Sequence, residues 1–153
     1  MEAVKDLQMQ VVKATQDYGV GSVLFRNAIG RKLGLNVTDI ACLNFLLIKG
    51  AATPTELAHY TGLTTGSATT MIDRLQKAHM ITRTPNPHDR RGLLIEINQK
   101  TRETMLLPLV SGVQQSQREL LDSYSKAELQ AIADFLTRFT QNITEHTARL
   151  DKK

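Results

Sequence analysis

The chain has 153 residues, 41% of them hydrophobic and 22% charged, which excludes a disordered or fibrous protein and suffices to bury one core. A net charge of +4 is compatible with an anionic partner but does not require one. The single cysteine, Cys42, excludes an intramolecular disulfide, and the chain has neither a signal-peptide layout nor an apolar run long enough for a membrane span. We therefore expect a soluble cytoplasmic protein with no membrane partner.

The first predicted element is a long helix from residue 4 to about residue 32. Apolar or small side chains recur there every three or four residues and form one stripe: Val4, Leu7, Val11, Ala14, Tyr18, Gly21, Phe25 and Ala28. Gly34 is expected to end this helix. A second helix is expected from an N-cap at Thr38-Asp39 to about Gly50. It is apolar on nearly every side, so we expect it to be buried.

A helix-turn-helix unit is predicted next. In "TPTEL", Thr53 serves as N-cap, Pro54 takes the first helical position and Glu56 closes a capping box. The short helix runs to about Tyr60. After the turn, Thr64 or Thr65 caps a helix that ends near residue 78, and its inward face carries Ala68, Met71, Ile72 and Leu75.

A β-hairpin and two further helices complete the predicted order. Residues 80–84 and 92–97 favour strands, and the charged loop between them is stiffened by Pro85 and Pro87. Asn98 caps a helix from about 99 to 123, in which Pro108 is expected to cause a kink or remove one hydrogen bond. A capping box over residues 125–128 opens the last helix, whose apolar face carries Leu129, Ile132, Ala133, Leu136, Phe139 and Ile143. The long terminal helices need a packing partner, either the other end of the chain or a second copy.

The exposed face of the second helix of the helix-turn-helix unit is small and hydroxylic at its start and basic at its end. This profile suits a helix that enters the major groove, because small residues allow close approach to the bases and cations anchor the flanks. On this helix alone, a surface helix with exposed threonines is an equal alternative. The predicted DNA-binding residues are Thr64, Thr65, Gly66, Ser67, Thr69, Thr70, Arg74 and Lys77.

The hairpin favours the DNA-binding interpretation over a merely solvated turn. Residues 71–102 carry lysine or arginine at positions 74, 77, 83, 90, 91, 100 and 102, against acids at 73, 89 and 96 only. An arginine on a narrow arm can enter a minor groove, and Asp89 is spaced to brace Arg91. The predicted binding residues of this arm are His88, Asp89, Arg90 and Arg91.

The stretch "ELAHYTGLTTGSATTMIDRLQKAHMITRTPNPHDRRGLLIEI" resembles the DNA-binding core of the MarR family of bacterial transcriptional regulators, and the flanking helices extend the resemblance over the whole chain. It implies a mainly α fold with a small β-hairpin wing: a dimerisation helix at 1–34, a winged helix-turn-helix at 35–98, and dimerisation helices at 99–153. Two departures are Asn86, where many members have aspartate, and His79, where many have glycine and where a positive φ would cause strain.

The resemblance implies a homodimer on double-stranded DNA with a pseudo-palindromic operator, in which the residue matching Arg91 enters the minor groove. The regulator is usually a repressor, released by a small aromatic or apolar acid as effector. The residues expected at the dimer interface are Leu7, Val11, Leu129, Ile132, Leu136 and Phe139.

Other functional sites are weaker candidates. Cys42 lies among core positions, so a buried structural thiol is favoured over a redox sensor. The scattered histidines predict no metal site, and no catalytic or cofactor motif is found. Tyr18, Phe25 and Phe45 are either core residues or the lining of a ligand cavity. The rival to a transcriptional regulator is a winged-helix architectural or protein-binding module without specific DNA recognition.

Overall fold

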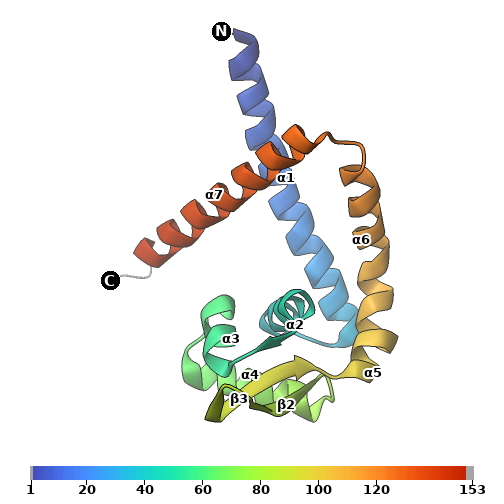
Figure 1. The fold of residues 1–153 in the computed structure, drawn as a ribbon, viewed down its shortest axis with the longest axis vertical. Helices are drawn as coiled ribbons and strands as arrows, with labels where there is room; N and C mark the ends of the chain where they lie inside the picture. Colours follow the sequence, from blue (N-terminus) through green and yellow to red (C-terminus); the bar gives the residue numbers. More distant parts are fainter. Residues whose placement is uncertain (1, 151–153) are drawn as a thin grey trace. The chain divides into compact units, whose positions relative to one another are not determined.

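The computed structural model describes residues 2–150, with the side chains of Glu2, Arg90 and Arg91 outside the described part (Figure 1). The chain forms two compact units, Met1–Leu109 and Val110–Lys153. The first unit contains four α-helices, followed by a hairpin and the start of a fifth helical region. The four helices are α1 (Glu2–Leu33), α2 (Val37–Lys49), α3 (Pro54–Thr61) and α4 (Thr65–Lys77). The predicted helix order is therefore confirmed.

A small antiparallel sheet packs with these helices. Its strand order is β1-β3-β2, from β1 (Ala51–Ala52), β2 (Ile81–Asn86) and β3 (Asp89–Ile97). The two hairpin strands were predicted, but both are longer than expected and only Pro87 and His88 separate them. The sequence did not predict β1, because two alanines after a glycine carry no strand pattern; β1 forms by pairing with Ile95 and Glu96 of β3.

The start of α2 corrects the predicted N-cap. Asn36, rather than Thr38 or Asp39, is the capping residue, and its side-chain oxygen accepts a hydrogen bond from the Asp39 backbone N–H at 2.9 Å. Asp39 instead occupies the third helical position and returns the bond, accepting from the Asn36 backbone N–H at 3.2 Å. The result is a reciprocal capping box that fixes the turn between α1 and α2.

The end of α4 explains how the helix leads into the hairpin. His79 has φ of 56°, so the predicted positive φ is confirmed. The His79 and Met80 backbone N–H groups donate to the carbonyl oxygens of Gln76 and Leu75, both at 2.9 Å, which is a Schellman motif. The His79 carbonyl then accepts from the Thr101 hydroxyl at 2.8 Å. These bonds set the direction in which β2 leaves the helix.

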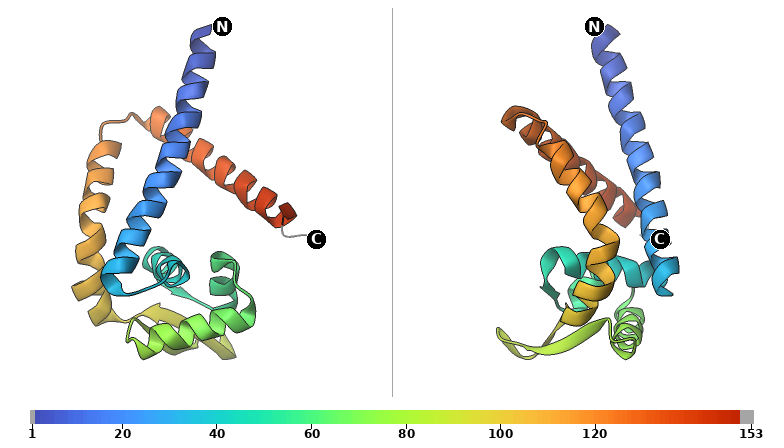
Figure 2. Two further views of the ribbon diagram at one scale, coloured as in Figure 1. Left: turned by 180° about the vertical axis from the view of Figure 1, so that it is seen from behind. Right: turned by 90° about the vertical axis from the view of Figure 1, so that its right-hand side faces the viewer.

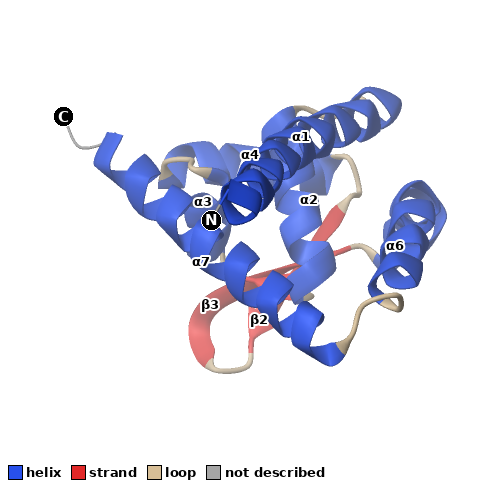
Figure 3. Cartoon of the chain, turned by 90° about the horizontal axis from the view of Figure 1, so that it is seen from above, coloured by secondary structure: helices blue, strands red, loops and turns tan. Residues whose placement is uncertain are grey.

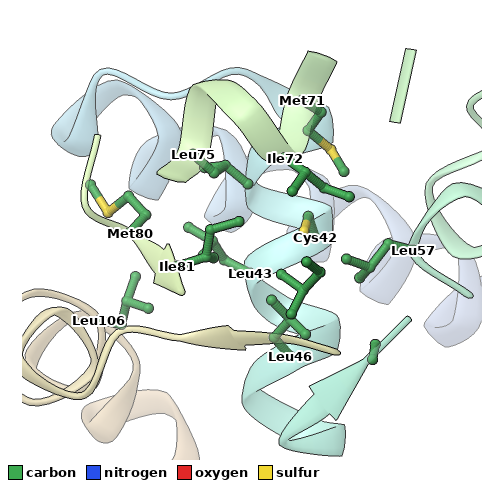
Figure 4. Close-up of a cluster of buried hydrophobic side chains, with 12 residues drawn as sticks. Cys42, Leu43, Leu46, Leu57, Met71, Ile72, Leu75, Met80, Ile81 and Leu106 are labelled. Carbon is green, nitrogen blue, oxygen red and sulfur yellow. The ribbon is translucent and has the colours of Figure 1, made fainter. Parts of the chain in front are cut away.

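One apolar core joins α2, α3, α4 and the sheet (Figure 4). All four residues predicted for the inward face of α4 are buried there, with Leu75 fully inaccessible. Leu43 and Leu46 of α2 pack against them from one side and Ile81 and Ile95 from the sheet. Because the core lies on one side of α4, the opposite side of that helix is left exposed.

The helix predicted from 99 to 123 is divided into three segments. Asn98 caps α5 (Gln99–Thr101) as predicted, a π-helical segment η1 spans Arg102–Leu106, and α6 runs over Leu107–Leu121. Pro108 has no N–H to donate to the carbonyl four residues earlier, and the wider turn of η1 accommodates that loss.

The last helix, α7 (Lys126–Leu150), belongs to the second unit and opens with the predicted capping box. The Ser125 hydroxyl and backbone N–H donate to the Glu128 carboxylate at 2.6 and 2.8 Å, and these bonds lower the pKa of Glu128. Over residues 2–150, no helix combines the length and apolar character needed to cross a membrane.

The capping box of α3 makes a pH-dependent contribution to stability. Glu56 accepts hydrogen bonds from Lys49 and from the backbone and hydroxyl of Thr53, and these lower its pKa from 4.5 to about 2. A lowered folded-state pKa stabilises the protein above about pH 4.5, and the contribution is lost as the pH falls towards 2.

We expect Glu56→Gln to lower the free energy of unfolding at pH 7 by about 0.5–1 kcal/mol, since the carboxylate is half exposed and partly screened. Urea titrations of both proteins from pH 7 to pH 2.5 should show this difference shrinking as the pH falls. Glu119→Gln removes an exposed carboxylate outside any capping box and serves as control. A difference that does not change with pH would contradict the role of the Glu56 charge.

Candidate nucleic-acid interface

The exposed side of α4 carries every residue predicted for the recognition helix. The apolar residues are buried against α2 and the sheet, so the remaining positions face solvent. Figure 2 shows α4 alongside the hairpin strands, with its outer side uncovered by the other elements of its unit. The exposed set is Thr64, Thr65, Gly66, Ser67, Thr69, Thr70, Arg74 and Lys77.

The hydroxyl groups on this face are ordered by local hydrogen bonds. The Thr64 hydroxyl caps α4 by accepting from the Ser67 backbone N–H at 3.3 Å. The Thr69 hydroxyl donates to the Thr65 carbonyl at 2.9 Å and the Thr70 hydroxyl to the Gly66 carbonyl at 3.1 Å. Because both hydroxyl protons are donated to backbone carbonyls, the two exposed threonines can act towards a partner only as hydrogen-bond acceptors and through their methyl groups. Base amino groups and thymine methyls are the groups that such a surface can contact.

Arg74 makes a contact that the sequence did not predict. Its Nη2 donates to Asp39 Oδ1 at 2.6 Å and its Nε to Asp39 Oδ2 at 3.3 Å. Two guanidinium nitrogens therefore bind the two oxygens of one carboxylate. Asp39 is 2% exposed, whereas 46% of the Arg74 side chain is accessible. The Asp39 carboxylate raises the pKa of the Arg74 guanidinium. The residues are 35 positions apart, so no local sequence pattern indicates the pair.

A second ion pair joins α4 to the hairpin. Asp73 on α4 and Arg83 on β2 form a hydrogen-bonded salt bridge on the exposed side of the unit. This pair ties the base of the hairpin to the helix and neutralises two of the charges in the basic window. Lys77 has no ion pair among the described residues, so its charge remains available to an anion.

The hairpin extends away from the helices as an arm, which Figure 2 shows in its right-hand view and Figure 3 from above. The Asn86 side chain accepts from the His88 backbone N–H at 3.0 Å and so supplies the acceptor that an aspartate would supply in this turn. The strand register moves from Pro85↔Leu93 to Asn86↔Asp89, so residues 90–92 form a bulge in β3. The side chains of Arg90 and Arg91 lie outside the described residues.

Asp89 packs closely against the glycine that follows the two arginines. A Cβ atom placed on Gly92 would lie 2.9 Å from Asp89 Oδ2 and 3.2 Å from Asp89 Cβ. A side chain at residue 92 would therefore require the Asp89 side chain to shift. His88 and Asp89 are both exposed at the turn.

The aromatic residues considered for a ligand cavity do not meet around one. Tyr18 is 70% exposed and Phe25 38% exposed, while Phe45 packs against Tyr60 with ring centroids 4.4 Å apart and ring planes tilted by 34°. A cavity of about 370 Å³ lies instead at the junction of α1 and α2. It is lined by Arg26, Asn27, Gly30, Arg31, Gly34, Leu35, Asn36, Val37 and Ile40.

The described part of the chain contains no group of three or more histidine, cysteine or acidic residues that would hold a metal ion. Cys42 is fully buried beneath α4. Its burial, reinforced by the nearby charge of Asp39, raises the pKa of the thiol to about 12. Cys42 therefore has neither the access nor the thiolate population of a reactive cysteine.

The helix–turn–helix of α3 and α4, followed by an extended hairpin, defines a winged helix-turn-helix protein. A model of the MarR family matches residues 33–92. The HTH-type transcriptional regulator YcgE of Bacillus subtilis is 32% identical over 145 residues, which cover 95% of this chain and 94% of that protein. The chain therefore belongs to the MarR family of DNA-binding transcriptional regulators.

Solved structures share the fold at lower sequence identity. The transcriptional regulator Tm0710 of Thermotoga maritima superposes with a TM-score of 0.61 at 18% identity, covering 92% of this chain and 98% of that one. The MarR family transcription regulator SP03579 superposes with a TM-score of 0.63 at 20% identity, covering 95% and 97%. The predicted fold class, mainly helical with a β-hairpin wing, is confirmed.

The burial of Cys42 predicts its behaviour towards a thiol reagent. We expect the native protein at pH 8 to resist labelling by a disulfide reagent such as Ellman's reagent, because the thiol is inaccessible and its pKa is about 12. The same protein in concentrated guanidinium should release one equivalent of chromophore at once. Rapid labelling under native conditions would show that Cys42 is accessible and would favour a redox-sensing role for it.

Proposed function

We propose that this protein is a sequence-specific repressor that binds double-stranded operator DNA through α4 and is released by a small-molecule effector. The observation that carries the proposal is the hydroxylic side of α4, exposed along its first two turns directly opposite a buried core. That side has no large side chain over residues 64–70, so the helix backbone can approach base edges closely. Lys77 at the far end is placed to meet a phosphate.

The hairpin supports this proposal as a second contact region. An arm tied to α4 through Asp73 and Arg83 moves with the recognition helix, so both can engage DNA in a fixed relation. We assign His88, Asp89, Arg90 and Arg91 to the minor groove or its flanking phosphates. Asp89 and Arg91 are the proposed brace and probe.

The terminal helices are assigned to a homodimer, with residues 1–34 and 99–153 as the dimerisation segments and 35–98 as the DNA-binding domain. In α1, Leu7 is 59% and Val11 45% exposed, and Met9, at 68%, lies on the opposite side of the helix. Exposed apolar surface on this scale is typical of an interface. The α7 stripe is uncovered too, with Leu136 46% and Phe139 38% exposed and Leu129 and Ile132 partly so.

The effector is proposed to be a small aromatic or apolar acid, and the cavity at the α1–α2 junction is the best-supported place for it. Its lining combines apolar side chains with Arg26 and Arg31, whose guanidinium groups could pair with a carboxylate. The cavity borders Asn36, the residue that caps α2. An occupant there is well placed to alter the direction in which α2 leaves α1.

DNA binding is tested with variants of the two proposed contact regions. We expect Arg91→Ala to weaken operator binding by about 1–3 kcal/mol, and Lys77→Gln to lower the slope of log K against log salt by about 0.9 through loss of one phosphate contact. Thr70→Val removes only a hydroxyl and should lower specific binding more than binding to random DNA. All three effects are measured by fluorescence anisotropy with a DNA fragment taken from upstream of the protein's own gene, on which the binding site has been located by footprinting.

Arg138→Gln is the control, since it removes an exposed charge on α7 that belongs to neither of the two proposed DNA-contact regions. Unchanged affinity in Arg91→Ala would contradict the assignment of the hairpin. If the parent protein binds all duplexes weakly and equally, the architectural or protein-binding alternative is favoured instead.

Dimerisation is tested on the α7 stripe. Phe139→Glu places a carboxylate in the proposed apolar interface, where it has no partner, so the mass measured by light scattering should fall from dimer to monomer. Gln130→Glu places the same group on the other side of α7 and should leave the dimer intact. A Phe139→Glu protein that remains dimeric would show that α7 does not form the interface by this stripe.

A further inference from the structure

Asp39 is the only charged residue buried in the described part of the chain, and the function proposed above does not use it. Its carboxylate accepts from the Asn36 backbone N–H and from two nitrogens of Arg74. A buried carboxylate needs such partners because burial removes its water. The three bonds therefore connect the first turn of α2 to the third turn of α4.

Arg74 is not free to act as an ordinary phosphate anchor. To reach a phosphate with its full guanidinium it would have to leave the Asp39 carboxylate buried and unpaired, which is costly. The negative charge of Asp39 also cancels the attraction that Arg74 alone would exert on DNA. Two parallel hydrogen bonds between a guanidinium and a carboxylate fix the orientation of both groups, and the single ammonium group of a lysine cannot form this arrangement.

The pair joins α4 to α2 by a polar contact outside the apolar core. Met71, Ile72 and Leu75 hold the helix by its buried side, whereas Arg74 projects from a different side towards α2. Beside the pair lies a cavity of about 290 Å³, lined by Asn36, Thr38, Leu63, Ser67, Thr70, Met71 and Arg74. Arg74 lines this space and reaches from α4 to Asp39 on α2.

We propose that Asp39 is a positioning residue for DNA recognition: by holding Arg74 it sets the rotation of α4 about its axis, and Arg74 acts on DNA affinity through Asp39 rather than through a phosphate. The inference rests on the proposed DNA-binding function and deepens it. It replaces the expectation that Arg74 contacts DNA directly. The face that carries Thr69 and Thr70 is then presented at the angle that the α2–α4 pair defines.

The test uses the full-length protein with its operator fragment and four variants: Asp39→Asn, Arg74→Gln, the double variant, and Arg74→Lys. Operator affinity is measured between 50 and 250 mM salt. Arg74→Lys keeps the charge but loses the fork, so it separates the two roles of Arg74. Lys77→Gln, an unpaired cation on the same helix, is the matched control for a phosphate contact.

We expect Asp39→Asn, Arg74→Gln and Arg74→Lys each to bind the operator at least tenfold more weakly, with the salt slope of the parent protein. The double variant should be no weaker than the worse single variant, because both substitutions remove one interaction. Two results would overturn the proposal. The first is a combination of two findings: the slope of log K against log salt falls by about 0.9 in Arg74→Gln, and Arg74→Lys binds the operator as tightly as the parent protein. The other is unchanged or tighter binding by Asp39→Asn.

A measurement without DNA keeps the inference separate from the proposed function. If the parent protein binds no duplex selectively, the proposed function fails, and the pair is then judged by amide hydrogen exchange in the free protein. Loss of the pair should speed exchange in α4 in all three single variants while exchange in β3 is unchanged. Equal exchange in the parent and the variants would overturn the positioning role. Circular dichroism of each variant confirms that the comparison is made between folded proteins.

Discussion

Burial of one side of α4 is the constraint on which the rest of the interface depends. Ala68, Met71, Ile72 and Leu75 recur at helical spacing and all lie in the core, where each of the three larger side chains contributes about 1.5–3 kcal/mol. Any large rotation of α4 would return some of them to water. The side that carries the threonines is therefore exposed as a consequence of packing, and its residues are available to a partner because the core does not need them.

Two ion pairs add to the packing that holds α4 in place. The core supports the helix from one side, the Asp39–Arg74 pair ties it to α2, and the Asp73–Arg83 pair ties it to the hairpin. The Schellman motif at His79 adds a backbone constraint at the point where helix becomes strand. These contacts tie α4 to both α2 and the hairpin, and the capped α1–α2 turn is connected to α4 through Asp39.

Much of this arrangement was predictable because it depends on neighbours in sequence. The Thr53–Glu56 and Ser125–Glu128 capping boxes and the buried stripe of α4 follow from local patterns, and the family resemblance implied the positive φ at residue 79; the structure contains each of them. Where a pattern was ambiguous, the prediction failed: Asn36 caps α2 in place of Thr38-Asp39, because a cap is chosen by which side chain reaches the free N–H groups.

By itself, the sequence determined the helix-turn-helix unit, the wing and the side of α4 that faces solvent, since periodicity, caps and turn residues act locally. Only the tertiary structure decided the partners of the charged residues. Asp39 and Arg74 are 35 positions apart, and Ala51 and Ala52 become a strand only when β3 lies beside them. Such contacts depend on how the elements pack rather than on the residues that surround each one, so a prominent exposed arginine in the sequence became a buried carboxylate's partner in the fold.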